Sequence, residues 1–240
     1  MTEASEQFFS VERDGNTIPG MLWLPAALAE SAAVPLVLMG HGGNGHKQQD
    51  YVKAIGRSFA KHHGIAAAAI DGPVHGDRRA DKGVDGQAVF NDFRATFNDP
   101  TVTDGMIADW KATLDHLLAN HSVLDADRVG YWGLSMGTMF GLPFTASESR
   151  VKAAVLGLMG TIPSHYGERL AADAPKIAAI PVLFLAQWDD ELVPREDAIK
   201  LFGALATKSK TLHVSPGKHA DVPPSEMRVS QSFLASHLAK

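Results

Sequence analysis

A serine with a glycine two positions to either side is the clearest chemical signal in this sequence. Ser135 lies at the centre of GLSMG at 133–137, a Gly-x-Ser-x-Gly motif. A β-branched and aromatic run at 128–132 precedes the motif, and an apolar, helix-compatible run follows it. This order predicts a sharp strand-to-helix turn that exposes the serine hydroxyl, with glycines where neighbouring elements leave no room for a Cβ atom. Ser135 is therefore a candidate nucleophile.

A nucleophilic serine needs a general base and a third group that orients the base, because its hydroxyl is too weak an acid to react alone. For this motif the acid and then the histidine follow the serine along the chain. A predicted strand at 181–185 runs into Asp189 and Asp190, and a predicted strand at 211–214 runs into His219. The sequence therefore offers His219 as the base and either aspartate as the acid.

The order of the apolar segments predicts an α/β fold. Strand-like runs at 8–12 and 18–24 flank the turn signal DGN at 14–16, which indicates an N-terminal antiparallel hairpin. Short apolar strands then alternate with helices, which favours a mostly parallel central sheet covered by helices on both faces. Strands are expected at 34–39, 65–70, 128–132, 153–158, 181–185 and 211–214, and helices at 49–61, 107–117, from 136 onward, 194–205 and 223–238.

The sequence contains no internal repeat and no linker that would divide it, so residues 1–240 are expected to form one domain. Two segments, near 74–103 and 160–178, lack clear periodicity. Irregular segments of this length are often lids or binding loops. We therefore expect a lid or pocket excursion at each of them.

Composition excludes several classes of function. A formal net charge of -5 and a pI near 6.1, with no block of basic residues, argue against nucleic-acid binding. The absence of cysteine removes disulfides, thiolate metal sites and thiol catalysis. The N-terminus does not resemble a signal peptide and no apolar run is long enough to span a membrane, so a cytoplasmic protein without membrane contact is expected. The oligomeric state, monomer or homodimer, is left open.

With a candidate base and a candidate acid following Ser135, the sequence resembles the α/β-hydrolase superfamily over nearly its full length. Its size is similar to that of dienelactone-hydrolase-like proteins and small serine esterases. The acid loop of this family often reads Asp-x-x-Val-Pro, which DELVP at 190–194 matches, so the resemblance favours Asp190 as the acid. Two positions depart from the family pattern, because Thr138 and Gln187 stand where glycine is common.

The oxyanion hole requires two backbone N–H donors aimed at the developing negative charge. One is expected from Met136, the residue after the nucleophile. The resemblance implies that the other comes from the loop that begins His41-Gly42-Gly43, with Gly43 as the donor and Asn44 as the next choice.

The expected substrate pocket is less specific. We predict that His41, Asn44, Met159 and Trp188 line it, with Phe90, Phe93, Phe97 and Ile162 either in the pocket or in ordinary packing beneath a loop. Asp71, His75 and Asp77 could suggest a metal cluster. No accepted ligand spacing accompanies them, and the resembling family uses a similar turn to organise loops, so no metal or cofactor is expected.

Together these residues predict a serine hydrolase that cleaves a carboxylic ester of a small or medium-sized molecule through an acyl-enzyme on Ser135. Alternatives on the same machinery are a thioester, an amide, a lactone or a carbon–carbon bond. A non-catalytic binding protein with the same fold is a weaker alternative, because binding alone needs no ordered nucleophile, acid and base. A metal-dependent hydrolase ranks third.

Overall fold

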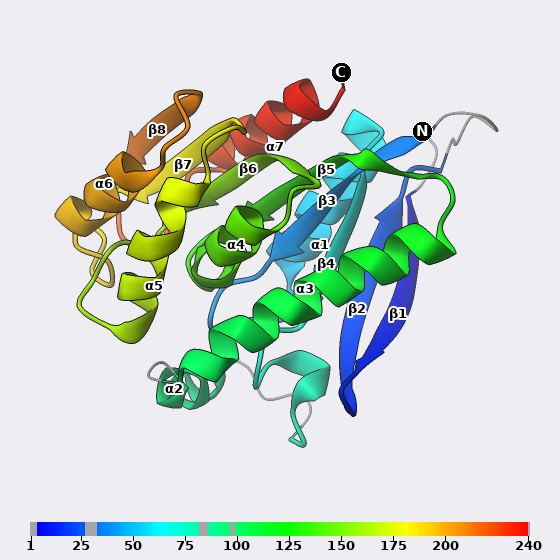
Figure 1. Cartoon of the computed structure of the whole chain (residues 1–240), viewed down its shortest axis with the longest axis horizontal. Coiled ribbons are helices and arrows are strands. Elements are labelled where there is room, and N and C mark those ends of the chain that lie inside the picture. The colour runs from blue at the N-terminus through cyan, green and yellow to red at the C-terminus, as the bar shows by residue number, and fades with distance from the viewer. Residues whose placement is uncertain (1–3, 27–32, 82–85, 97–98, 240) are drawn as a thin grey trace.

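The computed structural model describes residues 4–26, 33–81, 86–96 and 99–239. Its strands form one sheet in the order β1-β2-β4-β3-β5-β6-β7-β8 (Figure 1). The strands are β1 (Ser5–Arg13), β2 (Asn16–Leu24), β3 (Val34–Gly40), β4 (Ala66–Ile70), β5 (Leu124–Gly133), β6 (Val151–Gly157), β7 (Val182–Gln187) and β8 (Lys210–Ser215). The sheet is mostly parallel, as the sequence predicted.

The antiparallel part of the sheet is confined to its N-terminal edge. β1 pairs with β2 in a hairpin whose turn residues, Asp14 and Gly15, both have positive φ angles of 51° and 78°. Positive φ at both central positions is the requirement of a tight hairpin turn that matches strand twist. β2 then pairs antiparallel with β4, and the remaining neighbours are parallel. The predicted hairpin is confirmed.

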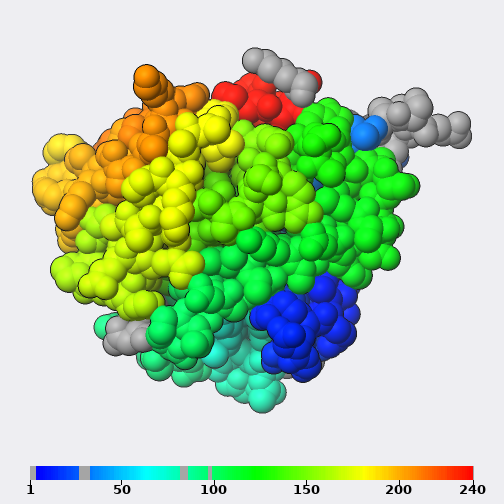
Figure 2. Space-filling view, in the orientation of Figure 1, coloured from blue at the N-terminus to red at the C-terminus, as the bar shows by residue number. Residues whose placement is uncertain are grey.

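Helices cover both faces of the sheet. Along β3, Leu36 and Leu38 enter one apolar cluster with α3 (Pro100–Asn120) and α4 (Met136–Ser147). Val37 and Met39 enter the opposite cluster with α1 (Asp50–Ser58) and α7 (Pro224–Leu238). Both faces of the strand are buried, which explains its continuous apolar sequence. The helices are α1 (Asp50–Ser58), α2 (Gln87–Ala95), α3 (Pro100–Asn120), α4 (Met136–Ser147), α5 (His165–Asp173), α6 (Arg195–Ala204) and α7 (Pro224–Leu238). In the space-filling view, atoms coloured green to yellow make up most of the near face (Figure 2).

The two segments expected to be irregular contain helices. α2 buries Val89 and Phe93, which are four residues apart, and α5 buries Tyr166 and Leu170 at the same spacing. A single i, i+4 pair in a nine-residue helix is too short a pattern to stand out in a longer window. The expectation of irregular structure was therefore wrong for both helices.

The parallel arrangement brings four strand ends to one edge of the sheet. β3, β5, β7 and β8 run in the same direction, so the loops that follow them lie along the carboxyl edge. β3 has β4 on one side and β5 on the other, which makes its end the point where the chain connections diverge. Ligand sites of open α/β sheets form at such a point. In the part of the chain that the structure describes, no helix is long and apolar enough to cross a membrane.

Candidate active site

Ser135 occupies a strained turn between β5 and α4. Its φ and ψ angles are 57° and −120°, a combination that L-residues rarely adopt. A Cβ atom on Gly137 would lie 2.5 Å from the carbonyl oxygen of Gly40, and one on Gly133 would lie 2.8 Å from the carbonyl oxygen of Gly137. The two glycines therefore allow β3, β5 and α4 to meet at this turn. Such a conformation costs on the order of 1–3 kcal/mol and persists only where surrounding contacts hold it.

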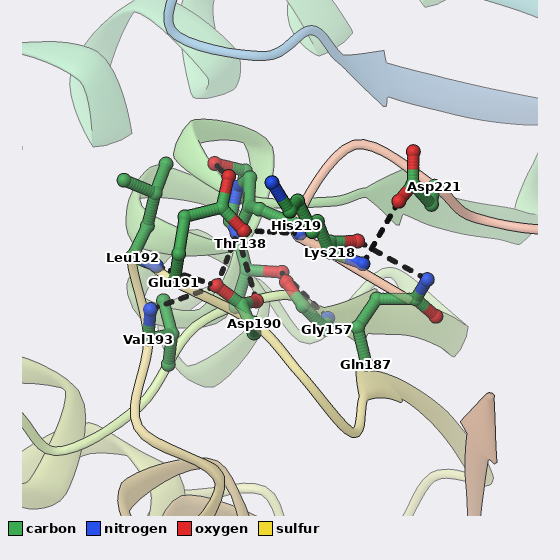
Figure 3. A network of polar contacts seen from close by, with 11 residues as sticks. Thr138, Gly157, Gln187, Asp190, Glu191, Leu192, Val193, Lys218, His219 and Asp221 are labelled. Carbon is green, nitrogen blue, oxygen red and sulfur yellow. Dashed lines mark hydrogen bonds and ion pairs between the residues drawn. The ribbon is translucent and has the colours of Figure 1, made fainter. Parts of the chain in front are cut away.

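The structure brings Ser135, His219 and Asp190 together from three strand ends. His219 Nε2 lies 2.8 Å from Ser135 Oγ. His219 Nδ1 lies 2.8 Å from Asp190 Oδ2 and 3.0 Å from Oδ1 (Figure 3). With Nδ1–H donating to the carboxylate, Nε2 of the neutral ring is an acceptor that faces the serine hydroxyl. This is the geometry of a nucleophile, a general base and an orienting acid.

Asp190 is held as a carboxylate by several donors. Its Oδ1 also accepts the backbone N–H groups of Leu192 and Val193, at 2.9 and 2.8 Å. Burial alone would raise the pKa of Asp190, but the hydrogen bond and charge of His219, with these two N–H groups, lower it below the usual value. The other candidate, Asp189, is exposed and accepts the backbone N–H of Gly217 instead. Of the two aspartates, Asp190 is the one that contacts the histidine.

Three further side chains hold the loop that carries His219. Glu191 accepts the backbone N–H of His219 at 2.9 Å, and Gln187 donates from Nε2 to the carbonyl of Lys218 at 3.2 Å (Figure 3). Asp221 accepts the backbone N–H of Lys218 at 2.9 Å. Gln187, which departs from the family pattern, is buried and ties β7 to this loop. These contacts fix the position of the imidazole relative to Ser135.

The two predicted oxyanion donors lie at the same place. Met136 and Gly43 both line a cavity that Ser135 and His219 also line. Within the described segments, neither backbone N–H makes a hydrogen bond to the protein. A Cβ atom on Gly43 would lie 3.2 Å from the Phe93 ring, tighter than most such contacts, so glycine suits this position. Two free donors beside Ser135 are the arrangement that a developing oxyanion on a reacting carbonyl would require.

The loop after β3 is fastened to the loop after β4. His75 Nε2 lies 3.0 Å from the Gly43 carbonyl oxygen, and Lys47 Nζ lies 2.6 Å from both Asp71 and Asp77. Lys47 and Asp71 are fully buried, and Asp71 also accepts the backbone N–H groups of Lys47 and Asp77. The carboxylates considered as metal ligands thus meet a lysine. No group of three or more His, Asp or Glu placed to hold a metal occurs among the residues that the structure describes.

His41, which was expected in the pocket, joins these two loops and does not line either cavity at Ser135. Its Nδ1–H donates to the Gly42 carbonyl at 2.8 Å, and its Nε2 accepts the Gly72 N–H at 2.9 Å. The ring packs edge-on against His75 at 5.0 Å between centroids. The imidazole is directed into the protein because both of its nitrogens are needed to join the two loops.

We expect His41 to make folding stability depend on pH. Burial, followed by the neighbouring His75, lowers the pKa of His41 from 6.5 to about 3. Between these values the unfolded chain binds a proton that the folded protein does not, so the free energy of unfolding falls as pH falls through this window. Urea denaturation of wild type should show a loss on the order of 2 kcal/mol from this group between pH 7 and pH 5. The free energy of unfolding of H41Q should depend less on pH than that of wild type. Equal slopes of this free energy against pH in the two proteins would contradict the role of His41.

Thr138 joins the nucleophile turn to the end of β6. Its buried Oγ1 lies 2.8 Å from the Gly133 carbonyl, 2.7 Å from the Gly157 carbonyl and 2.7 Å from the Gly157 nitrogen. One hydroxyl proton can serve one carbonyl at a time, while the oxygen accepts the Gly157 N–H. The Gly157 carbonyl also accepts the Ser135 N–H at 2.9 Å. The hydroxyl that replaces the family's glycine therefore supports the strained serine.

T138V is expected to lower both stability and turnover. The change keeps the shape but removes the acceptor of the Gly157 N–H and the donor shared by the two carbonyls, and a buried N–H left without a partner costs about 1–3 kcal/mol. T138S should restore much of both properties, because it retains the hydroxyl. T113V is the matched control, since Thr113 Oγ1 is buried with no partner within the described chain and its loss should not destabilise the protein. Thermal unfolding and kcat against a chromogenic ester measure the effect; equal results for T138V and T113V would contradict it.

Two cavities meet at Ser135. The histidine-side cavity, about 580 Å³, extends past Ala220 and Val222, which follow His219 in the chain. The methionine-side cavity, about 340 Å³, extends past Met139 and Met159. The residues common to both include Gly43, Ser135 and His219, with Phe90, Glu191 and Leu192. Ser135 and His219 are therefore open to a ligand that extends into either cavity.

The predicted pocket residues divide between these cavities and other places. Asn44 lines the histidine-side cavity and Met159 the methionine-side cavity. Trp188, which was expected in the pocket, lines neither cavity: the residue is 53% exposed, and its ring centroid lies 4.0 Å from the Arg195 guanidinium carbon. Phe90 is in both cavities, and Phe93 and Ile162 line the methionine-side cavity. Phe97 lies outside the described residues.

Sequence reasoning did not identify Tyr51 and Glu191, both of which line the histidine-side cavity. The position of Glu191 beside Asp190 is a local signal that could have directed attention to it. Tyr51 offers no such signal, because it lies in the first turn of α1 and reaches the site only through the packing of that helix.

Comparison with known proteins was made against families, curated sequences and solved structures. No family model matches the chain. The protein bem46 of Schizosaccharomyces pombe is 26% identical over 131 residues, which are 47% of this chain and 44% of that protein. The PEG-bound structure of a cold-adapted esterase from an Arctic intertidal metagenomic library is 44% identical, with a TM-score of 0.85, over 98% of this chain and 95% of that one.

A more distant structure, dienelactone hydrolase from Anabaena variabilis, has the same fold. It is 19% identical with a TM-score of 0.71 over 99% of this chain and 98% of that one. The esterase likeness, at high identity over nearly all of both chains, goes further than fold. On these grounds the chain belongs to the α/β-hydrolase superfamily.

Proposed function

We propose that this protein is a serine esterase that cleaves the carboxylic ester of a small or medium-sized molecule. The observation that carries the proposal is the line of contacts from Ser135 Oγ through His219 to Asp190, at 2.8 Å for each step. The similarity to a cold-adapted esterase supports an ester as the bond. The cavities beside Ser135, about 340 and 580 Å³, suit groups of modest size on each side of that bond.

In the proposed first step, Ser135 Oγ attacks the ester carbonyl carbon as His219 Nε2 takes its proton. Asp190 keeps Nδ1–H of the ring in place and stabilises the imidazolium. The N–H groups of Met136 and Gly43 donate to the oxyanion of the tetrahedral intermediate. His219 then returns the proton to the leaving alcohol, and an acyl-enzyme remains on Ser135.

In the second step, His219 accepts a proton from water, and the resulting hydroxide attacks the acyl-enzyme. The carboxylic acid is released and Ser135 regains its proton. The sum of both steps is ester plus water to acid plus alcohol. Apart from the substrate and water, every group that takes part in these two steps comes from the chain itself.

The proposal is tested by the hydrolysis of p-nitrophenyl butyrate, compared with a matched thioester and a matched amide, each with and without EDTA. We expect the highest kcat/KM for the oxygen ester and no effect of the chelator. A preference for the thioester or amide would move the proposal to that bond on the same triad. Loss of activity in EDTA would contradict the mechanism, and the absence of all three activities would favour a binding protein with this fold.

A further inference from the structure

The histidine-side cavity contains polar side chains whose hydrogen-bonding groups the protein does not fully use. Tyr51, Gln49, Asn44 and Gln87 line it together with Glu191. Most of them are uncharged groups that can hydrogen-bond, and neither a lysine nor an arginine is among the described residues that line this cavity. The methionine-side cavity is by contrast lined mainly by aromatic and aliphatic side chains.

Tyr51 provides a hydrogen-bond donor at this cavity. Its hydroxyl oxygen accepts the backbone N–H of Gly42 at 2.7 Å. Burial raises the pKa of Tyr51 to about 12, so the phenol keeps its proton at neutral pH. Since the oxygen already accepts from Gly42, the O–H bond points elsewhere, and in the described chain this proton has no acceptor. The phenol can therefore donate to an oxygen atom inside the cavity.

Gln49 is the second incompletely used group. Its Oε1 is covered and has no partner within the described residues, and a Cβ atom on Gly45 would overlap it. Gln49 lines the cavity, and its Nε2 donates to none of the described residues. Buried polar groups of folded proteins are generally paired with protein or water. In the free protein water can fill this role, and a ligand that displaces it must supply equivalent oxygen atoms.

The charge at this cavity limits the ligand further. Glu191 is a carboxylate whose pKa is lowered by hydrogen bonds from backbone N–H groups, first that of His219. No cation lines the described part of the cavity. A phosphate or carboxylate on the ligand would therefore face the negative charge of Glu191 without a cation to pair with. Hydroxyl groups are neutral and both donate and accept, so they match the donors of Tyr51 and Gln49 and the acceptor of Glu191.

The position of the histidine-side cavity indicates whether it holds the alcohol or the acyl portion of the ester. Ala220 and Val222 line only this cavity, whereas Met136, whose N–H is the proposed oxyanion donor, lines only the other. The leaving alcohol must receive its proton from His219 Nε2, so it lies toward the histidine loop. We propose, on the basis of the proposed esterase function, that the alcohol portion of the substrate is an uncharged polyol or sugar whose hydroxyls bind Tyr51 and Gln49.

The test compares two esters that form the same butyryl-enzyme: 1-butyrylglycerol and 2-methylbutyl butyrate, in which methyl groups replace both hydroxyls. Because deacylation is shared, the ratio of their kcat/KM values reports the leaving-group side alone. We expect wild type to prefer the glycerol ester by about tenfold or more, because the apolar ester leaves polar groups of the cavity unpaired.

Y51F and Q49M should each move this ratio toward one, since each removes one donor. Q48M is the control, because Gln48 is a neighbouring glutamine that does not line the cavity. The ratio cancels any general loss of activity in Y51F, where the contact with Gly42 is also removed. Thermal unfolding of each variant shows that it folds.

A second pair of esters shows on which side of the ester bond the preference for hydroxyl groups arises. Methyl 3-hydroxybutyrate and methyl 3-methylbutyrate share a leaving group and differ in a hydroxyl on the acyl side, where no preference is expected. A ratio near one for the glycerol pair, a ratio unchanged in Y51F and Q49M, or a preference confined to the acyl pair would overturn the inference. Cleavage of p-nitrophenyl butyrate in the same preparation separates these results from failure of the esterase proposal, which would abolish all the activities together.

Discussion

Replacement of Ser135 by alanine is expected to reduce kcat against p-nitrophenyl butyrate by about 10⁴- to 10⁶-fold, the range for loss of a triad nucleophile. The proposed acyl-enzyme cannot form without Oγ, so neither step of the reaction can proceed by this route. Stability should not fall, because the positive φ of Ser135 is held by backbone contacts, and the N–H bond to Gly157 does not involve the side chain. Steady-state kinetics and thermal unfolding measure the two properties.

Ser147, at the C-terminal end of α4, is the matched control for this variant. Its hydroxyl donates to the Phe144 carbonyl, and it does not line the cavities at Ser135. S147A should therefore retain wild-type kcat. Activity of S135A within tenfold of wild type, with the fold intact, would rule out Ser135 as the nucleophile.

Substitution of Asp190 by asparagine is expected to lower kcat by about 10⁴-fold with little change in KM. The amide nitrogen of asparagine can donate to Nδ1, which would place the ring proton on Nε2 and direct it at the serine. The imidazole then cannot accept the serine proton, and the charge that stabilises the imidazolium is also lost. Kinetics at pH 7 with saturating ester measures the loss directly.

D189N removes the same charge one residue earlier and provides the control. Asp189 is exposed and contacts the Gly217 backbone, so the kcat of D189N should remain close to the wild-type value. Equal losses in D190N and D189N would mean that net charge near the loop, and not the orientation of His219, governs activity.

The sequence predicted the features that depend on local pattern. The motif around Ser135 requires a particular turn, and the glycines at 133 and 137 are the positions where a Cβ atom would collide with backbone. The hairpin turn at Asp14 and Gly15 and the buried parallel strands are also local patterns. Strand direction then brings the loops after β3, β5, β7 and β8 to one edge without further information.

The features that were not predicted depend on packing between distant segments. α2 and α5 each show a single apolar i, i+4 pair, which is a weak periodic signal. His41 and Trp188 stand beside predicted catalytic loops, but sequence does not tell which way a loop side chain points. His41 is turned inward by two hydrogen bonds, and Trp188 is turned outward against Arg195.

The supporting residues of the site were missed for the same reason. Tyr51 contacts Gly42 through the packing of α1, and Gln187 reaches a carbonyl 31 residues away in the chain. Thr138 was noticed only as a departure from a family pattern. Its bonds to Gly133 and Gly157 require β5, β6 and α4 to be in place.

The central claim is that Ser135 is a nucleophile activated by His219. The most direct measurement is peptide mapping by mass spectrometry after incubation with a fluorophosphonate, which forms a covalent adduct with an activated serine. We expect one adduct per chain on the peptide that contains Ser135, with no adduct in S135A and a greatly slowed reaction in H219Q. An adduct on another serine, or equal labelling in H219Q and wild type, would contradict it.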